Sequence, residues 1–322
     1  MAIDSTDLPI AAMAGEAGPH AADAFALLAD ETRLAVLLAL WQAYDSENDD
    51  NSLRFSEIFD RVEYDSPGNL NYHMEKLEGQ FLRRREDGSY EIRTTGLKFV
   101  RSIIAGSGVD DVTLEPTEID QPCPFCDATT TIGYRDGTVT HACTSCPGAA
   151  PDADADGALS VVPFDPAGLR ERAAEEVWAA SVVAALRGAR SMFQRLCPAC
   201  SGAVDGWFDC PDEGETVSEN RRLSVPVRAH FQCRTCRKHT VDPPRGLALF
   251  HPAVVSFYGD HDVSTRVSAD DFRTVKRFYA LMNGHDVELL SAEPTRVAVT
   301  ARRGDDELRV TFDETVRVID AN

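Results

Sequence analysis

Eight of the nine cysteines in this 322-residue chain occur as four C-x2-C pairs, and these pairs constrain the fold more than any other feature of the sequence. The pairs are Cys123 with Cys126, Cys143 with Cys146, Cys197 with Cys200, and Cys233 with Cys236. Two thiolates at this spacing can hold one metal ion, and two such pairs supply the four sulfurs of a tetrahedral zinc site. A site filled by four sulfurs leaves no position open for water or substrate, so its role is structural.

The residues between the pairs predict which pairs belong together. Between the first two pairs, TTTIGYRDGTVTH predicts two strands around an RDG turn. Between the third and fourth pairs, AVDGWF and VRAHFQ predict two strands separated by the inserted loop PDEGETVSENRRLSVP. We therefore predict two zinc ribbons that hold two structural zinc ions. Redox or iron ligation is the alternative, which two hairpin knuckles disfavour.

One cysteine and three histidines lie near these pairs without belonging to them. Cys210 ends the strand before the inserted loop, and it is either a free buried thiol or a substitute ligand. We expect His141 to be a strand residue, whereas His230 and His239 are weaker candidates for ligation.

The cellular compartment bears on the metal interpretation. No apolar run approaches the roughly 18 to 20 residues that cross a bilayer, and the N-terminus lacks the basic start and apolar block of an export signal. We therefore expect a cytoplasmic protein with no membrane partner. Thiols stay reduced in the cytoplasm, so regularly spaced cysteines there are metal ligands more often than disulfide partners.

The chain is strongly acidic, but its charge is unevenly distributed. It has 53 acidic and 32 basic residues, a net charge of −21, and a near absence of lysine. This composition resembles that of proteins from salt-loving archaea. An acidic chain repels phosphate, which argues against nucleic-acid binding. Residues 52–104, however, carry equal numbers of acids and bases, so one segment has no net charge.

The first third of the chain carries a series of helix signals. In ADAFALLADETRLAVLLALW, the apolar residues recur largely at spacings of three and four, and Asp30 is the expected cap between two helices. These apolar residues are Phe25, Leu28, Leu34, Leu37, Leu38 and Trp41. After the polar loop DSENDDNSLRF, SEIFDRV predicts a further short helix.

The next segment, DSPGNLNYHMEKLEGQF, predicts an amphipathic helix. Ser66 is the expected N-cap, and Pro67 stands at the first helical position, where its missing N–H costs nothing. Its core stripe is Leu70, Met74 and Leu77, its opposite face is Asn69, Tyr72 and Lys76, and its flanks are Asn71 and His73. Such a helix can lie in a groove of DNA.

Two strand-like runs, 81–85 and 90–94, then flank an EDGS turn and predict a β-hairpin, and a last helix follows over 95–104. This stretch resembles the ArsR-type winged helix-turn-helix regulators. LLADETRLAVLLAL is similar to their opening, and GNLNYHMEKLEGQFL to their recognition helix and first wing strand. The resemblance covers about the first third of the chain and implies double-stranded DNA as a partner.

The residues expected to contact DNA lie on the helix and the hairpin. Polar side chains of the helix can reach base edges or backbone, and arginines of the hairpin can contact phosphates or enter the minor groove. The candidates are Ser66, Asn69, Asn71, Tyr72, His73, Lys76, Arg83, Arg84, Arg85 and Arg93. In the alternative interpretation RRR is a solvated strand edge, Tyr72 is a half-buried ring, and His73 is a packed residue.

Many ArsR-type regulators sense metals through cysteines before the recognition helix, or through Asp and His on the last helix. FSEIFDRV has no cysteine, and TTGLKFVRSII has neither Asp nor His. Metal-triggered release by those routes is therefore not expected.

The remainder of the chain predicts a strand in GALSVVPF, a helical block, and a C-terminal antiparallel sheet of three or four strands preceded by helices. The expected fold is α+β and multidomain: a winged helix-turn-helix, two zinc ribbons, and a small C-terminal sheet with helices. The expected segments are a disordered tail at 1–20, the winged helix at 21–106, the first ribbon at 115–165, a connecting helix at 166–196, the second ribbon and following helix at 197–262, and the C-terminal α/β-hairpin domain at 263–322.

No catalytic pattern stands out: we find no nucleophile elbow, phosphate-binding glycine loop, H-E-x-x-H or deaminase signature. We expect a non-enzymatic, homodimeric transcriptional regulator that reads promoter DNA, with ribbons for stability, dimerisation or partner contact. Two alternatives remain. One is a scaffold on the transcription machinery, similar to the archaeal initiation factor related to TFIIE, and the other is a protein-interaction module.

Overall fold

The computed structural model describes residues 26–45, 47, 51–62, 64, 66–106, 112–148, 156–210 and 227–322. The chain divides into two compact units, Met1–Ser107 and Gly108–Asn322, which we call unit 1 and unit 2. The fold is α+β with small antiparallel sheets. The expected tail at 1–20 and Phe25 lie outside the described residues.

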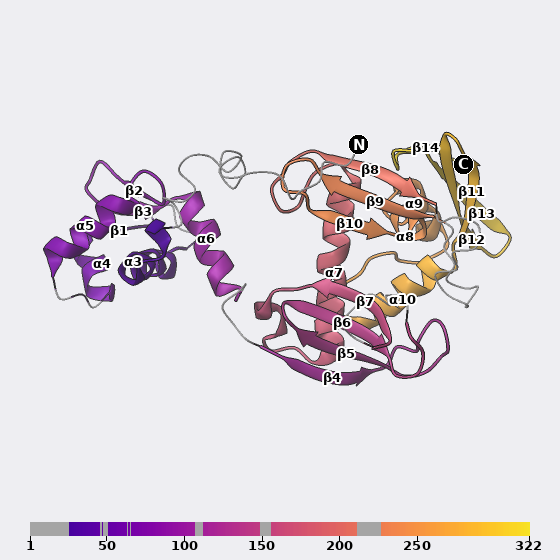
Figure 1. Ribbon diagram of the computed structural model, residues 1–322, viewed down its shortest axis with the longest axis horizontal. Coiled ribbons are helices and arrows are strands. Elements are labelled where there is room, and N and C mark those ends of the chain that lie inside the picture. Colours follow the sequence, from indigo (N-terminus) through magenta and orange to yellow (C-terminus); the bar gives the residue numbers. More distant parts are fainter. Residues whose placement is uncertain are drawn as a thin grey trace, which may run out of the picture. The chain divides into compact units, whose positions relative to one another are not determined.

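Unit 1 combines helices with one small sheet (Figure 1). Its elements are α3 (Glu31–Gln42), β1 (Ser52–Leu53), α4 (Phe55–Val62), α5 (Pro67–Leu77), β2 (Leu82–Arg84), β3 (Tyr90–Ile92) and α6 (Thr94–Ile104). The expected cap is confirmed, because the Asp30 side chain accepts a 3.0 Å hydrogen bond from the Arg33 N–H at the start of α3. Ser66 occupies the N-cap of α5, but its side chain makes no capping hydrogen bond.

The core of unit 1 forms where the apolar stripes of its helices meet the hairpin. Leu70, Met74 and Leu77 of α5 are fully buried, which confirms the expected stripe. They pack with residues of α3 and β3 in one cluster that includes Leu37 and Ile92. This packing sets the orientation of α5, so the side chains opposite its stripe face outward.

One strand of unit 1 was not predicted. The expected loop between 45 and 55 contains β1, which pairs with β3 through Ser52 opposite Glu91 and Leu53 opposite Tyr90. A two-residue strand is too short to produce an alternating pattern. It forms because the hairpin presents an edge and because Leu53 is buried in the core.

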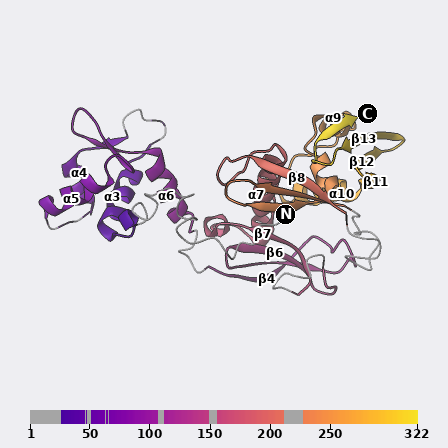
Figure 2. The same ribbon diagram turned by 45° about the horizontal axis from the view of Figure 1, so that its top comes forward.

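Unit 2 holds three antiparallel sheets in the part of the chain that the structure describes (Figure 1, Figure 2). Their strand orders are β4-β5-β6-β7, β10-β9-β8 and β11-β12-β13-β14. The strands of the first two sheets are β4 (Leu114–Ile119), β5 (Thr130–Arg135), β6 (Thr138–Cys143), β7 (Ala158–Pro163), β8 (Val204–Asp209), β9 (Arg228–Cys233) and β10 (His239–Asp242). The strands of the third are β11 (Asp286–Ala292), β12 (Thr295–Arg303), β13 (Asp306–Phe312) and β14 (Val318–Ala321).

The helices of unit 2 join these sheets. They are η1 (Pro166–Leu169), α7 (Ala174–Phe193), α8 (Pro244–Ala248), α9 (Pro252–Asp260) and α10 (Phe272–Asn283). Figure 1 and Figure 2 show α7 between the β4–β7 sheet and the β8–β10 sheet, and its residues contact both. Trp178 and Val182 are buried with the first sheet, whereas Met192 is buried with the second and third.

The segments expected at 115–322 thus pack as one compact unit around α7. The predicted third strand of the first ribbon is β7, which pairs with β6, and the predicted C-terminal sheet has four strands. β4, β10 and α8 were not predicted. β4 carries Pro116 and has an exposed face, so it gives a weak strand signal, which suits an edge position.

Within the described residues, no helix has the length and apolar character needed to span a membrane.

Candidate metal centres and a candidate nucleic-acid interface

The first two cysteine pairs come together in the first ribbon. The four sulfurs of this cluster lie within 4.8 Å of one another. The Sγ atoms of Cys123 and Cys146 are 3.6 Å apart, and those of Cys126 and Cys143 are 3.5 Å apart. The β5–β6 hairpin produces this arrangement, because it returns the chain from the first knuckle to the second.

The last two pairs form a second cluster of the same kind. Its four sulfurs also lie within 4.8 Å of one another. The Sγ atoms of Cys197 and Cys236 are 3.5 Å apart, as are those of Cys200 and Cys233. Strands β8 and β9 connect the two knuckles, so the pairing expected from the spacing is confirmed in both ribbons.

The donor set and its geometry fit zinc. A Zn–S bond of about 2.3 Å places the sulfurs of a tetrahedral site about 3.8 Å apart, close to the Sγ distances in both clusters. Four thiolates are the donor set of a closed structural site. Cys210 belongs to neither cluster, and burial, together with the charge of Asp209, raises the pKa of its thiol. Cys210 is only partly exposed, and it lies outside both clusters as a free thiol.

Backbone N–H groups point at the sulfurs from inside each knuckle. In the second ribbon, the N–H groups of Cys236 and Thr235 lie 3.5 and 3.4 Å from the Sγ of Cys233. They lower the pKa of that thiol to about 6, against the effect of burial. In the first ribbon burial raises the pKa of Cys143, but the N–H groups of Cys146 and Ser145 outweigh it and bring the pKa to about 7. Cys143 and Cys233 can thus reach the metal-binding thiolate form near neutral pH, whereas burial raises the pKa of Cys123 to about 12.

Three of the four knuckles close in the same way. The residue after the second cysteine has a left-handed backbone with φ between 58° and 60°: Asp127, Ser201 and Arg237. Its N–H donates to the carbonyl of the first cysteine, at 3.0, 2.9 and 3.1 Å respectively. Only the knuckle Cys143–Cys146 differs, because Pro147 follows it and has no N–H to donate.

The three histidines near the clusters are not in either group of metal-binding atoms. His141 is a buried residue of β6, as expected, and burial lowers its pKa to about 4. His230 and His239 instead stack with the half-exposed Trp207 on one face of the β8–β10 sheet, with a 3.1 Å contact between Nδ1 of His230 and Nε2 of His239. The ring stack explains their positions without a metal.

The second candidate site is the outer face of α5 in unit 1. Tyr72 is 54% exposed, so it is not the half-buried ring of the alternative interpretation. Lys76 lies 5.3 Å from the centroid of the Tyr72 ring, and both project away from the core stripe. The Asn69 amide donates to the Tyr64 hydroxyl at 2.9 Å, and the Asn71 amide to Glu75 at 2.7 Å. The face therefore presents a ring, a cation and two amides to solvent.

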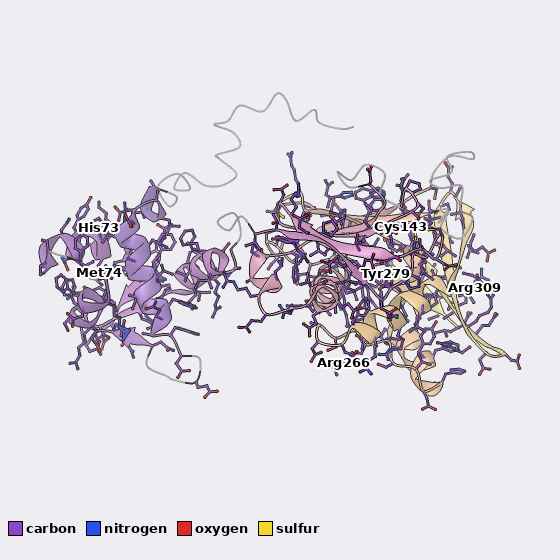
Figure 3. The ribbon with its side chains drawn as sticks, turned by 90° about the horizontal axis from the view of Figure 1, so that it is seen from below. His73, Met74, Cys143, Arg266, Tyr279 and Arg309 are labelled. Carbon is purple, nitrogen blue, oxygen red and sulfur yellow. The ribbon has the colours of Figure 1, made fainter. Side chains whose placement is uncertain are left out.

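His73 lies at the edge of this face and is mostly buried. Its Nδ1 is 3.3 Å from a carboxylate oxygen of Asp30, the residue that caps α3, and its neighbour Met74 points into the core (Figure 3). Burial raises the pKa of Asp30, but the hydrogen bonds from Arg33 and the nearby His73 lower it below its usual value. His73 therefore packs between α5 and the cap of α3, as the packed-residue alternative describes.

The hairpin arginines lie in different surroundings. Arg83 is exposed and pairs with Glu91 at 2.6 Å, and Arg84 lies over the Tyr90 ring at 5.7 Å. Arg85 is half-buried, and Arg93 donates to the carbonyl of Gly79. Arg83 and Arg84 of β2 and Lys76 on the outer face of α5 are thus exposed cations of unit 1.

Sequence reasoning did not identify the groups beside the first knuckle that come from distant segments. Arg245 of α8 and Lys276 and Tyr279 of α10 line a cavity together with Pro122 and Phe125. These residues carry no motif. The one available signal was an arginine directly after two prolines in DPPRG, which indicates a helix start but not a site.

Comparison with known proteins gives two family matches. One family, described as a domain of unknown function (DUF7351), matches residues 120–318. Another, described as a domain of unknown function (DUF7347), matches residues 21–103. No curated protein and no solved structure matches the chain. The match over residues 120–318 spans more than half of the chain and includes both cysteine clusters, so the chain belongs to the DUF7351 family.

Proposed function

We propose that this chain is a DNA-binding transcriptional regulator. In this proposal unit 1 is an ArsR-like winged helix-turn-helix, and two structural zinc ions hold the ribbons of unit 2. The observation that carries it is the orientation of α5, whose apolar stripe is fully buried while Asn69, Tyr72 and Lys76 face outward. A helix anchored in this way can enter the major groove, where amide and ammonium groups reach base edges.

The order of elements supports the winged-helix interpretation. α3, α4 and α5 are followed by the β2–β3 hairpin and by α6, which is the order expected from the resemblance. Arg83 and Arg84 on β2 are exposed beside the end of α5 and could contact phosphates. Ser66, Asn71, His73, Arg85 and Arg93 stay candidates as well, with His73 and Arg93 engaged in contacts within unit 1.

The charge of residues 52–104 is compatible with DNA binding. These residues carry no net charge in a chain of net charge −21, so this segment repels phosphate less than the chain does as a whole. Attraction to phosphate weakens steeply as salt rises. In concentrated salt we therefore expect base contacts and apolar burial to supply most of the affinity.

DNA binding is tested in the full chain with two variants that each lose three arginines. The DNA is a genomic fragment that genome-wide mapping identifies as a bound site. Replacing Arg83, Arg84 and Arg85 by Ala should weaken binding, and should reduce the slope of log K against log salt by about 0.9 for each phosphate that the variant no longer neutralises. The control replaces Arg302, Arg303 and Arg309 in unit 2. Equal affinity of wild type and the hairpin variant overturns the wing assignment.

The DNA-binding measurement, together with copurification, distinguishes the regulator from the two alternatives. A regulator should prefer certain sequences, and as a homodimer it should protect two half-sites related by symmetry. Copurification with RNA polymerase and no preferred sequence would instead favour the scaffold related to TFIIE. Failure to bind any genomic fragment would favour the protein-interaction module.

The metal part of the proposal has its own test. Zinc bound to four thiolates would supply cross-links that hold ribbons too small to fold alone. Native mass spectrometry should find two zinc ions per chain in wild type, one in Cys200→Ser and two in Cys210→Ser. One ion or none in wild type contradicts the paired-ribbon assignment, and loss of an ion from Cys210→Ser contradicts the ligand set.

A further inference from the structure

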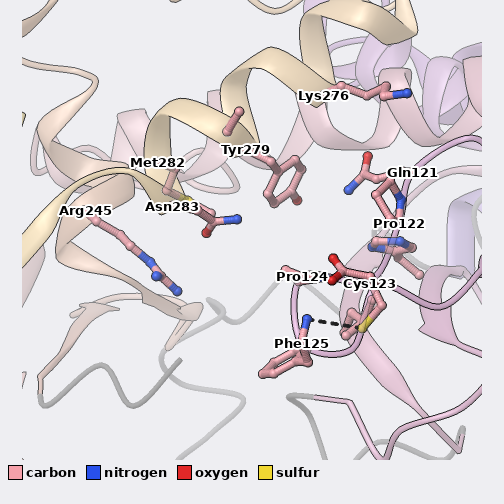
Figure 4. A pocket seen from close by; sticks show the side chains of 14 residues that line it. Gln121, Pro122, Cys123, Pro124, Phe125, Arg245, Lys276, Tyr279, Met282 and Asn283 are labelled. Atoms are coloured by element: carbon pink, nitrogen blue, oxygen red, sulfur yellow. Dashed lines mark hydrogen bonds between the residues drawn. The ribbon is translucent and has the colours of Figure 1, made fainter. Parts of the chain in front are cut away.

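A cavity of about 370 Å³ lies in unit 2 against the first cysteine knuckle (Figure 4). The knuckle forms one side of the cavity, and α8 and α10 form the others. The residues that matter here are Phe125, His141, Arg245, Lys276, Tyr279 and Met282. The cavity falls in the size range of pockets for small organic molecules, which begins at about 300 Å³.

The distinctive group in this cavity is Arg245. Figure 4 shows its side chain extending from α8 toward the knuckle. The backbone of Arg245 is held in place, because its carbonyl accepts a 2.9 Å hydrogen bond from Nδ1 of His285. Its Nε is buried, and no residue in the described part of the chain pairs with it. Burial lowers the pKa of this guanidinium, but an arginine stays charged at neutral pH.

An unpaired, half-buried arginine is notable in a chain where acids outnumber bases 53 to 32. Taking a cation out of water costs free energy unless an anion or hydrogen-bond acceptors compensate it. The other cation of the cavity is compensated in this way, since Nζ of Lys276 lies 2.8 Å from a carboxylate oxygen of Asp120. Arg245 therefore offers a site for an anion that the described residues do not fill.

The rest of the cavity is suited to an apolar body. Phe125, Met282 and the ring of Tyr279 line it, together with Pro122 and Pro124. The buried Nε2 of His141 also borders it and has no hydrogen-bond partner among the described residues. The cavity thus combines the unpaired Arg245, the paired Lys276, an apolar wall and the unpartnered Nε2 of His141, and Asp127 is the one acidic residue among the described residues of its lining.

We propose that this cavity binds a small organic anion, a carboxylate or phosphate ester that carries one compact apolar group such as an aromatic ring. Arg245 holds the anionic group, because its planar fork matches carboxylate and phosphate oxygens. The ring lies between Tyr279, Phe125 and Met282. This inference goes beyond DNA binding and does not depend on it.

The structure provides a reporter for the test. Trp178 donates a 3.4 Å hydrogen bond from Nε1 to Gln121, and its ring lies 4.7 Å from His141 and 6.2 Å from Tyr279, all of which border the cavity. In the full, metal-loaded chain with Trp41→Phe and Trp207→Phe, fluorescence comes from Trp178. Benzoate and phenyl phosphate are titrated separately, which distinguishes a carboxylate from a phosphate ligand, and benzylamine serves as a cation of similar shape.

We expect at least one anion to change the Trp178 signal saturably and benzylamine to leave it unchanged. Arg245→Met should weaken that binding about tenfold or more, as expected when a charge-assisted bidentate hydrogen bond is removed. Arg273→Met should bind as the parent does, because Arg273 is a solvated cation of α10 outside the cavity lining, with 88% of its side chain exposed. The zinc content and thermal midpoint of each variant verify that it is folded.

Three outcomes would overturn the proposal: neither anion saturates the signal, Arg245→Met binds the anion as tightly as the parent, or benzylamine binds as well as the anions. If Arg245→Met proves unstable, Arg245→Lys replaces it as the test variant. It keeps the charge but not the fork, and should bind more weakly than the parent and retain selectivity against benzylamine.

Discussion

Single residues decide how the chain turns at each metal centre. In three knuckles a non-glycine residue adopts a left-handed backbone directly after the second cysteine, which costs conformational energy. In the remaining knuckle Pro147 prevents this closure, and the N–H of Cys143 donates to the carbonyl of Gly157 at 2.8 Å. Gly157 has a φ of 73°, and a Cβ on it would collide with the carbonyl of Cys143. Position 157 therefore requires a residue without a side chain.

Gly157→Ala should destabilise the first ribbon more than Gly137→Ala does. Both glycines have positive φ, but a Cβ at Gly137 meets nothing within 4 Å, so that variant has only the backbone strain, about 1 kcal/mol. The difference between the two variants isolates the collision at Cys143. Thermal unfolding and the rate of zinc release to a chelator measure it. Equal effects would mean that the close approach does not matter.

A buried histidine predicts how stability depends on pH. His285 is 5% exposed, its Nδ1–H donates to the carbonyl of Arg245, and its Nε2 accepts from the Tyr258 hydroxyl at 2.8 Å. The neutral ring makes both bonds, and burial lowers the pKa of His285 below its usual value. The unfolded chain then binds the proton more readily, so stability is complete above the unfolded pKa of about 6.5 and falls as the pH drops below it.

Between about pH 7 and pH 5, the thermal unfolding midpoint of His285→Gln should therefore fall less than that of wild type. At about pH 7 the midpoint of the variant should be lower than that of wild type. Glutamine can donate and accept but does not titrate. Protonation of the cysteines affects both proteins equally and cancels in the comparison. Parallel pH profiles for the two proteins would assign the acid sensitivity to other groups.

At the scale of elements, the amphipathic helix α5 was predictable, whereas β1 and α8 were not. The stripe of α5 repeats over several turns, so its period identifies both the helix and its buried face. β1 has two residues and α8 has five, too few to show a period. Whether such a segment becomes a strand, a helix or a loop depends on the surface it meets. For β1 that surface is the edge of the hairpin.

Met74→Ala on α5 should destabilise unit 1 by about 2–5 kcal/mol, because it leaves a cavity in a fully buried position. Lys76→Ala, on the exposed face of the same helix, should change stability by about 0.5 kcal/mol or less. Hydrogen exchange of peptides from residues 31–104 measures both effects without interference from unit 2. Similar values for the two variants would mean that α5 is not anchored by its stripe.

At the scale of the whole molecule, the chain has separate cores. Among the described residues, the apolar cluster of unit 1 shares no residue with the clusters of unit 2, and both cysteine clusters belong to unit 2. In unit 2 the two ribbons are coupled, since both pack on α7. Loss of metal from one ribbon should therefore affect the other, but not unit 1.

Treatment with a strong chelator tests this organisation. Hydrogen exchange should accelerate in peptides covering 114–143, 197–210 and 227–242, and in α7 between them, while peptides from α3, α5 and α6 keep their protection. Cys200→Ser should loosen α7 at its C-terminal end first, because that end contacts the second ribbon. Loss of protection in unit 1 would show that the two units fold together.

The cysteine spacing and the apolar periods by themselves determined the two clusters, the hairpins between their knuckles, and the buried face of α5. A C-x2-C knuckle and a helix stripe are set by residues a few positions apart, and the strand signals between two knuckles indicate which pairs of cysteines belong together. Tertiary structure alone decided that α7 serves both ribbons and that Arg245 and Tyr279 meet the knuckle at Cys123. Those residues lie more than 100 positions from it, and no local pattern records which distant side chains a packed core brings together.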